Sequence, residues 1–139
     1  MCDFVAIGAQ TDLAQLRAVL CTADWDFDSD VPPRPWAREH FPSTDAVVCV
    51  TLDGCSCQLL RGLGSRGQRG NEAHLAGPGY LFRRALAATA MRFGSIRLLT
   101  YSSSGQSPAD VQPHRRVTRL SQFLRCGLEP DEKFLCIIA

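Results

Sequence analysis

The sequence AVVCVTLDGCSCQLLR spans residues 46–61 and carries two apolar runs on either side of Asp53-Gly54. Asp-Gly is a preferred pair for the two-residue turn that joins antiparallel strands. Both runs have the length and apolar content of strands that bury at least one face. This stretch therefore predicts a β-hairpin with strands at residues 46–52 and 55–61.

The two-residue turn also predicts which side chains of the hairpin share a face. Cys55 and Cys57 are expected on the same face, which is the more apolar of the two. That face also carries Val48 and Val50, whereas Cys49 lies on the opposite face and is a poor third ligand for a metal. A buried free cysteine behaves as a small apolar side chain, so core packing is one interpretation of the pair.

The rest of the chain supplies the other elements of the predicted fold. Strands are expected at residues 3–7, 96–101 and 133–138, and helices at residues 12–22, 80–93 and 113–126. The order β-α-β-β-α-β-α-β begins with the six elements of a ferredoxin-like split βαβ unit. We therefore expect a single α+β domain, residues 1–139, with a ferredoxin-like βαββαβ core and an appended helix and strand. The expected sheet is mixed, with about five strands and helices mostly on one face.

The composition is that of an ordinary globular domain. The chain has 139 residues, of which 45% are hydrophobic and 21% charged. It holds no apolar run of the roughly 18 residues that span a bilayer, and its N-terminus lacks a basic leader with a cleavage site. We therefore expect a cytoplasmic protein. Its seven cysteines are then expected to be thiols or metal ligands, because the cytosol keeps thiols reduced.

Cys55-Ser56-Cys57 is the strongest local signal for chemistry. Two thiolates beside a turn can bind a soft metal ion such as zinc or copper(I), or form a strained disulfide. In an extended strand their α-carbons are about 6.5 Å apart, at the upper limit for a disulfide, so a working pair needs a bulge or a wider turn. Core packing, a redox pair and a metal site all stay open, and any catalytic role falls to Cys55 and Cys57.

Met1-Cys2 and Gly54-Cys55-Ser56-Cys57 resemble a group of uncharacterised small bacterial proteins. Those proteins begin Met-Cys, run a strand into a Gly-Cys-x-Cys turn and close with helix and strand segments. The strand ending at Tyr101-Ser102 is a looser match, and Ser56 stands where the group has glycine. The resemblance implies no activity, but it implies that Cys2, Cys55 and Cys57 belong to one site, in which all three are candidate metal ligands. A ferredoxin-like topology conflicts with this, since Cys2 then begins its strand at the end opposite the turn.

Residues 102–107 read SSSGQS and lie between a predicted strand and a predicted helix. Hydroxyls and free amides at a helix N-terminus suit an anion such as phosphate. The string is similar to the S-x-S-G-x-[ST] loop of sugar-isomerase domains, which implies phosphate-binding roles for Ser102, Ser104, Gly105 and Ser107. The parallel βα repeats of that family are missing from the predicted elements. Ser107 with Asp110 also forms a plain capping box.

Charge is divided unevenly along the chain. Residues 1–60 hold nine acids and three arginines, whereas residues 61–125 hold eleven arginines and two acids. Arg115 and Arg119 of the predicted helix are candidate contacts to a phosphate-bearing partner. A GC-rich genome would also produce this arginine bias. Nucleic acid is not the favoured partner, because the arginine-rich loop at residues 61–70 has no aromatic side chain to stack on bases.

These observations favour a small cytosolic binding or accessory protein, because no complete set of acid, base and nucleophile can be assembled from them. One alternative is a Cys-x-Cys thiol-redox or metal-thiolate protein, and another is a phosphate- or nucleic-acid-binding module that uses the arginine-rich half. No cofactor is predicted apart from the zinc or copper that the cysteines could hold. The expected partner is a protein or an anion, and not a membrane.

Overall fold

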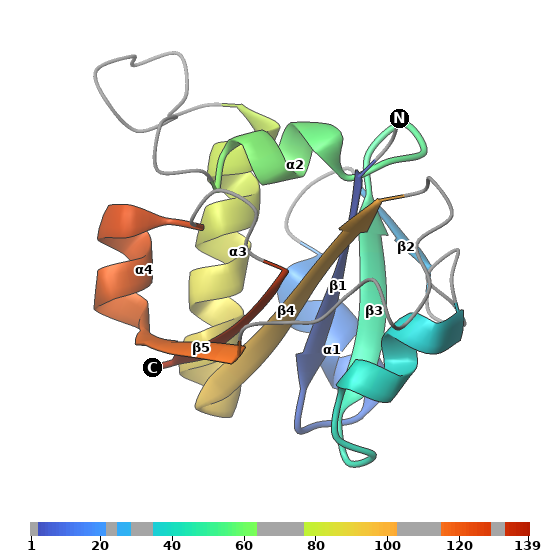
Figure 1. Ribbon diagram of the computed structural model, residues 1–139, viewed down its shortest axis with the longest axis vertical. Coiled ribbons are helices and arrows are strands. Elements are labelled where there is room, and N and C mark those ends of the chain that lie inside the picture. Colours follow the sequence, from blue (N-terminus) through green and yellow to red (C-terminus); the bar gives the residue numbers. More distant parts are fainter. Residues whose placement is uncertain (1–2, 22–24, 29–34, 64–76, 103–114, 129–132) are drawn as a thin grey trace.

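The computed structural model describes residues 3–21, 25–28, 35–63, 77–102, 115–128 and 133–139 (Figure 1). Six strands lie within these residues: β1 (Asp3–Ala9), β2 (Asp26–Asp28), β3 (Ala46–Thr51), β4 (Ser95–Ser102), β5 (Arg115–Arg119) and β6 (Phe134–Ile138). The helices are α1 (Leu13–Leu20), α2 (Cys57–Arg61), α3 (Pro78–Phe93) and α4 (Leu120–Cys126), with a 3-10 helix, η1 (Pro35–His40).

The six strands form one mixed sheet in the order β2-β3-β1-β4-β6-β5. Neighbouring strands are antiparallel except β5 and β6, which are parallel. The chain is therefore an α+β protein with a mixed sheet, as the sequence predicts. The ferredoxin-like core is not shown, because it needs a strand at residues 55–61. In its absence β3 pairs directly with β1, and β1 lies between β3 and β4.

β1 is the most deeply placed strand, and its nearly unbroken apolar sequence explains why. Val5 and Ile7 pack into the core beneath the α-helices, while Phe4 and Ala6 pack into a second core on the other face of the sheet. Only Asp3, at the start of the strand, is exposed. An apolar strand of this kind is stable only where both of its faces are covered.

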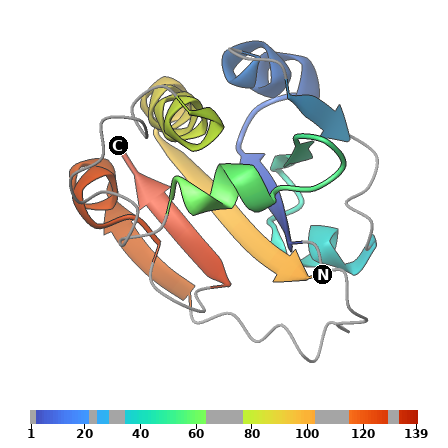
Figure 2. The ribbon, with the colours of Figure 1, turned by 90° about the horizontal axis from the view of Figure 1, so that it is seen from above.

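The α-helices cover one face of the sheet and η1 lies on the other, as Figure 2 shows from above. Helix residues at i, i+3 and i+4 spacing, such as Leu16 and Leu20 of α1 and Phe82 and Leu86 of α3, are fully buried in the larger core. The apolar residues of each helix recur on one side of it, and this amphipathic pattern accounts for the layer. The prediction of helices mostly on one face is confirmed for the described α-helices.

The second core depends on a close approach between η1 and β1. Phe41 follows η1, and a Cβ placed on Gly8 would lie 2.4 Å from the Cδ1 atom of Phe41. Only glycine leaves room for the aromatic ring against the strand backbone at this point. Phe41 is buried there and packs beside Phe134 with a ring-centroid distance of 6.0 Å.

The predicted helix at residues 113–126 is wrong in its first half. Residues 115–119 form β5, parallel to β6, and helix α4 begins only at Leu120. Val117 and Thr118 are β-branched residues, which suit a strand, and they alternate as a strand requires. Thr118 is buried, whereas Val117 is 61% exposed. Pairing with β6 therefore overrides the helical spacing of Val117 and Leu120.

Candidate functional site

The turn at Asp53-Gly54 forms as predicted. Leu52 and Cys55 make an isolated antiparallel bridge, with N–H···O distances of 2.8 Å from Leu52 to Cys55 and 3.4 Å in the other direction. Asp53 and Gly54 have φ angles of 56° and 87°, the left-handed values that a two-residue hairpin turn of this type requires. The predicted second strand at residues 55–61 is nevertheless wrong, because helix α2 begins at Cys57.

Ser56 is the residue that takes the chain out of the hairpin. Its side chain is completely buried, and its Oγ accepts a hydrogen bond from the N–H of Val5 at 3.0 Å and donates one to the carbonyl of Val50 at 2.5 Å. Its own N–H donates to the carbonyl of Asp3 at 2.8 Å. Ser56 thus joins β1 to the end of β3, and the backbone turns there into α2.

Cys57 lies against the first residue of β1. Its Sγ accepts a hydrogen bond from the backbone N–H of Asp3 at 3.3 Å, and its side chain is partly exposed. Because β1 runs antiparallel to β3, the start of β1 meets the turn at one end of the sheet. The topological conflict that a ferredoxin-like order would create for Cys2 is therefore absent. Cys2 itself lies outside the described residues.

The Cys55 side chain lies on the opposite face of the sheet from Val48 and Val50, with which it was predicted to share a face. Val48 and Val50 belong to the core beneath the α-helices, whereas Cys55 packs against the second core, which contains Cys49. The predicted common face of Cys55 with Val48 and Val50 is wrong. The chain leaves the ladder directly after the Leu52–Cys55 bridge, so no continuing strand holds the Cys55 side chain to the face of its neighbours.

The bend at Ser56 changes the chemistry available to the two thiols. Ser56 has φ −101° and ψ 8°, in the bridge region that borders the helical one and far from extended values. Helical geometry places residues i and i+2 about 5.4 Å apart at Cα, well inside the range that a disulfide spans, whereas a strand places them about 6.5 Å apart. Cys55 and Cys57 are both free and partly exposed. The two reasons for expecting an inert core pair, extended spacing and burial, are therefore removed.

Metal ligation by Cys55, Cys57 and Cys2 remains a prediction. Among the residues that the structure describes, no group of three His, Cys, Asp or Glu side chains is close enough to hold a metal ion. Cys55 and Cys57 supply two thiols, and a third ligand would have to come from outside the described ranges. Cys2 precedes Asp3 in the sequence and is the natural candidate.

The predicted phosphate loop, residues 102–107, begins at the same end of the sheet as the turn that carries Cys55 and Cys57. Ser102 is the last residue of β4, and its partner in the neighbouring strand is Asp3 of β1. Ser104, Gly105 and Ser107 lie outside the described residues, so their predicted role in anion binding stays a prediction.

Arg115 and Arg119 lie on a strand rather than on the predicted basic helix. They are the first and last residues of β5, which pairs on one side with β6 and forms an edge of the described sheet. Arg119 is exposed. Exposed charge on an edge strand discourages pairing with other chains, which is a structural role that needs no ligand. Their predicted role in anion binding stays a prediction.

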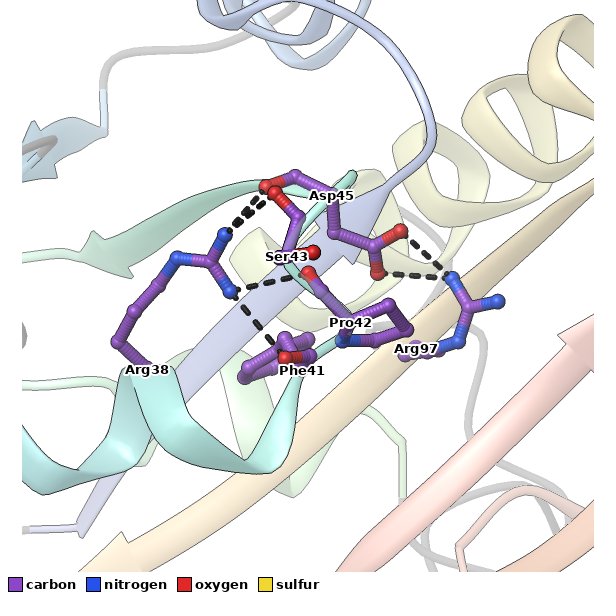
Figure 3. Close-up of polar contacts among 6 residues, drawn as sticks. All are labelled: Arg38, Phe41, Pro42, Ser43, Asp45 and Arg97. Carbon is purple, nitrogen blue, oxygen red and sulfur yellow. Dashed lines mark hydrogen bonds and ion pairs between the residues drawn. The ribbon is translucent and has the colours of Figure 1, made fainter.

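A second polar cluster escapes sequence reasoning because its members are far apart in the chain. The Nη1 atom of Arg97 donates to both carboxylate oxygens of Asp45, at 2.9 and 2.7 Å, and the Asp45 side chain is 1% exposed (Figure 3). Arg38 donates to the backbone carbonyl of Asp45 at 2.9 Å. Figure 3 shows the same guanidinium reaching three further carbonyls, those of Phe41, Pro42 and Ser43. These bonds fix the segment after η1 onto the sheet.

Cys136 is the cross-strand neighbour of Arg97 in this cluster. Burial raises the pKa of the Cys136 thiol above its ordinary value, with a smaller opposing effect from Arg97 and a smaller reinforcing one from Asp45. A thiol with a raised pKa is a weaker nucleophile at neutral pH, because less of it is ionised. Cys136 is therefore a poorer candidate for thiol chemistry than its position beside two charged groups suggests.

Comparison of the chain with protein-family models, with curated proteins and with solved structures found no match. No described helix is long and apolar enough to cross a membrane. The candidate site is accordingly defined by its own geometry, which joins the Cys55-Ser56-Cys57 turn to the first residue of β1.

Proposed function

We propose that the protein is a small accessory protein that exchanges thiols and disulfides with a partner through Cys55 and Cys57. One observation carries the proposal: the backbone bends at Ser56, which places the α-carbons of two partly exposed cysteines within the range of about 4.4–6.8 Å that disulfides span. The hydrogen bonds of Ser56 to β1 and β3 support it further, because they hold the bend in place on a rigid sheet.

Cys57 is the attacking thiol in this proposal and Cys55 is the resolving thiol. The Cys57 thiolate attacks one sulfur of a partner disulfide, forms a mixed disulfide and releases the other partner sulfur as a thiolate. The Cys55 thiolate then attacks Cys57 Sγ, closes the Cys55–Cys57 disulfide and releases the second partner sulfur. Two electrons pass to the partner, and the protons lost by the two cysteines balance those taken up by the two released thiolates.

The contacts of the two cysteines support this division of roles. Cys57 Sγ is held at the start of β1 by hydrogen bonds with the backbone N–H and carbonyl of Asp3, and its side chain is partly exposed. Cys55 instead packs against the second core, where it is less suited to meet a large partner first.

The experiment is reaction of the reduced protein with glutathione disulfide, followed by mass spectrometry of peptides. We expect an internal Cys55–Cys57 disulfide in the unaltered chain. Cys55→Ser should accumulate a mixed disulfide with glutathione at Cys57, because the resolving thiol is missing. Cys126→Ser is the matched control, since Cys126 is exposed and lies on α4, and it should leave the internal disulfide unchanged. Resistance of both thiols to glutathione disulfide until the protein is unfolded would overturn the proposal.

A metal-thiolate site is the second candidate, and the Asp3–Cys57 hydrogen bond is the observation that favours it. Outer-sphere hydrogen bonds commonly orient metal ligands, and this one also ties Cys57 to the residue that follows Cys2. Zinc or copper(I) would suit a set of thiolates. Elemental analysis of protein purified without chelator tests this: about one ion per chain, lost in both Cys57→Ser and Cys2→Ser, supports a metal site. Metal-free protein that forms the internal disulfide supports thiol exchange instead.

A further inference from the structure

The four described α-helices carry arginine but no acidic residue. Their arginines are Arg17 of α1, Arg61 of α2, Arg83, Arg84 and Arg92 of α3, and Arg125 of α4. All four helices cover the same face of the sheet (Figure 2), so the arginines that they carry belong to one layer of the molecule. The described helices therefore carry a net positive charge. This layer does not coincide with the arginine-rich second half of the sequence, because Arg17 belongs to the acidic first half.

The described acids lie elsewhere, apart from Asp12, which caps the start of α1. They occur in strands, in η1 or in turns: Asp3, Asp26, Asp28, Glu39, Asp45 and Asp53. Arg97, on the η1 side of the sheet, is neutralised by its ion pair with Asp45. The four described α-helices thus carry arginine as their only charged residue type, and the described acids belong to other elements.

The outward face of α3 is the part of this layer with the most exposed apolar surface. Leu81, Arg84, Ala88 and Met91 follow one another at spacings of three, four and three, and all four are exposed. Met91 is 72% exposed and Leu81 is 37% exposed. With Arg92, these residues form a stripe of about 16 Å along the helix, which we call the α3 stripe.

Two guanidinium groups near the ends of the α3 stripe are held in place by aromatic rings. The Arg84 guanidinium carbon lies 5.9 Å from the ring centroid of Tyr80, and that of Arg92 lies 5.6 Å from the ring centroid of Phe93. Neither arginine forms an ion pair with any described acid. A guanidinium that is stacked but unpaired is pre-organised to receive a carboxylate, because less side-chain freedom is lost on binding.

We propose that the α3 stripe is the docking site for an amphipathic α-helix of a partner protein, with acidic residues beside its apolar seam. The 3-4-3 spacing of the stripe matches the way two helices pack side by side. Ala88, at the middle, lets the partner helix approach closely, and Met91 can adapt its shape to an apolar side chain. Arg84 and Arg92 are eight residues apart, so acids about two turns apart on the partner could pair with both.

Charge and polarity distinguish this occupant from the others. A second copy of the chain would place arginine opposite arginine if α3 packed on α3, which is unfavourable. A nucleic acid would pair with Arg84 and Arg92 but would leave Leu81 and Met91 against charged phosphates, without an apolar partner. An acidic amphipathic helix satisfies both kinds of side chain, and arginine and methionine are enriched at protein–protein interfaces.

The experiment measures binding of the full chain to a synthetic amphipathic helix by fluorescence anisotropy. The probe peptide carries leucine at three- and four-residue spacing with glutamate beside it, and a companion peptide carries glutamine in place of each glutamate. We expect the acidic peptide to bind and the glutamine peptide to bind much more weakly. Arg84→Gln with Arg92→Gln should weaken binding of the acidic peptide about tenfold or more. Met91→Gln, which leaves the net charge unchanged, should also weaken it.

The control variant is Thr44→Glu, which lowers the net charge by one unit on an exposed residue that precedes β3. It should bind the peptide as the unaltered chain does, and thermal unfolding should show that every variant is folded. An equal loss with Thr44→Glu, or no loss with Met91→Gln, would show that only net charge matters and would overturn the proposal. Tighter binding to duplex DNA or to anionic lipid vesicles than to the acidic peptide would also overturn it. Dimerisation of the chain that Met91→Gln abolishes would assign the stripe to a second copy instead.

Discussion

The backbone N–H of Asp3 donates a hydrogen bond to the Sγ of Cys57, which lies 54 positions further along the chain. Asp3 also pairs with Ser102 of β4. The start of β1, the turn that carries Cys55 and Cys57, and Ser102 at the beginning of the predicted phosphate loop therefore meet at one end of the sheet. Candidate functional segments that are distant in sequence are brought together by the central position of β1.

Ser56→Ala should destabilise the protein by about 1–3 kcal/mol, because the buried N–H of Val5 and the carbonyl of Val50 both lose their partner in the hydroxyl. Urea unfolding measures the change. Ser121→Ala, on an exposed position of α4, is the control and should have little effect. A loss no greater than that of the control would show that the hydroxyl does not hold the turn.

Arg97→Met should destabilise the protein by about 2–3 kcal/mol at neutral pH. It leaves the Asp45 carboxylate buried without its ion-pair partner, although the partial exposure of Arg97 lets water relieve some of the cost. Adding Asp45→Asn should restore part of the loss, since the buried charge is then removed as well. The free energies of unfolding of the two single variants and the double variant form the test. Additive losses would mean that the pair is not energetically coupled.

Gly8→Ala should destabilise the protein by about 1–3 kcal/mol, because the added Cβ would overlap the ring of Phe41. Phe41→Leu in the same chain should relieve part of this loss, since a smaller side chain can move aside. Gly62→Ala provides the contrast: its Cβ would lie 2.3 Å from the backbone Cα of Gly79, which cannot move independently of α3. Thermal unfolding measures the loss in each variant. A loss in Gly8→Ala that Phe41→Leu relieves identifies a side-chain clash, whereas the loss in Gly62→Ala comes from a clash with backbone.

The free energy of unfolding should decrease above about pH 9, partly because the Cys136 thiol is buried in the folded protein. The pKa of Cys136 is raised in the folded protein, so the unfolded chain ionises this thiol first and binds fewer protons. The stabilisation that the neutral Cys136 thiol provides is fully present below the pKa of this thiol in the unfolded chain. It is lost as the pH rises through the pKa of the thiol in the folded protein. Cys136→Ser should lose less stability than the unaltered chain between about pH 8 and pH 10 in urea unfolding. Cys126→Ser, at an exposed position, should show the same decline as the unaltered chain.

Local sequence patterns predict most of the elements. The apolar run of β1, the periodic apolar residues of α1 and α3, and the Asp53-Gly54 turn all form where expected, because the pattern that predicts each of them lies within a short segment of the chain. The candidate thiol pair is also identified by spacing alone. The distance between Cys55 and Cys57 and their exposure to solvent are not predicted by spacing, since both depend on whether the backbone after the turn is extended or bent.

The sequence by itself determined an α+β chain, a tight turn beside two cysteines and an excess of arginine in the second half. Tertiary structure decided the rest. Ser56 bends the chain into α2 because the amide of Val5 and the carbonyl of Val50 lie within reach of its hydroxyl, and these belong to different strands. Residues 115–119 form a strand because β6 offers a ladder that local propensity cannot foresee. The positive helix layer likewise arises only when four separate helices pack on one face of the sheet, because surface charge depends on which elements become neighbours.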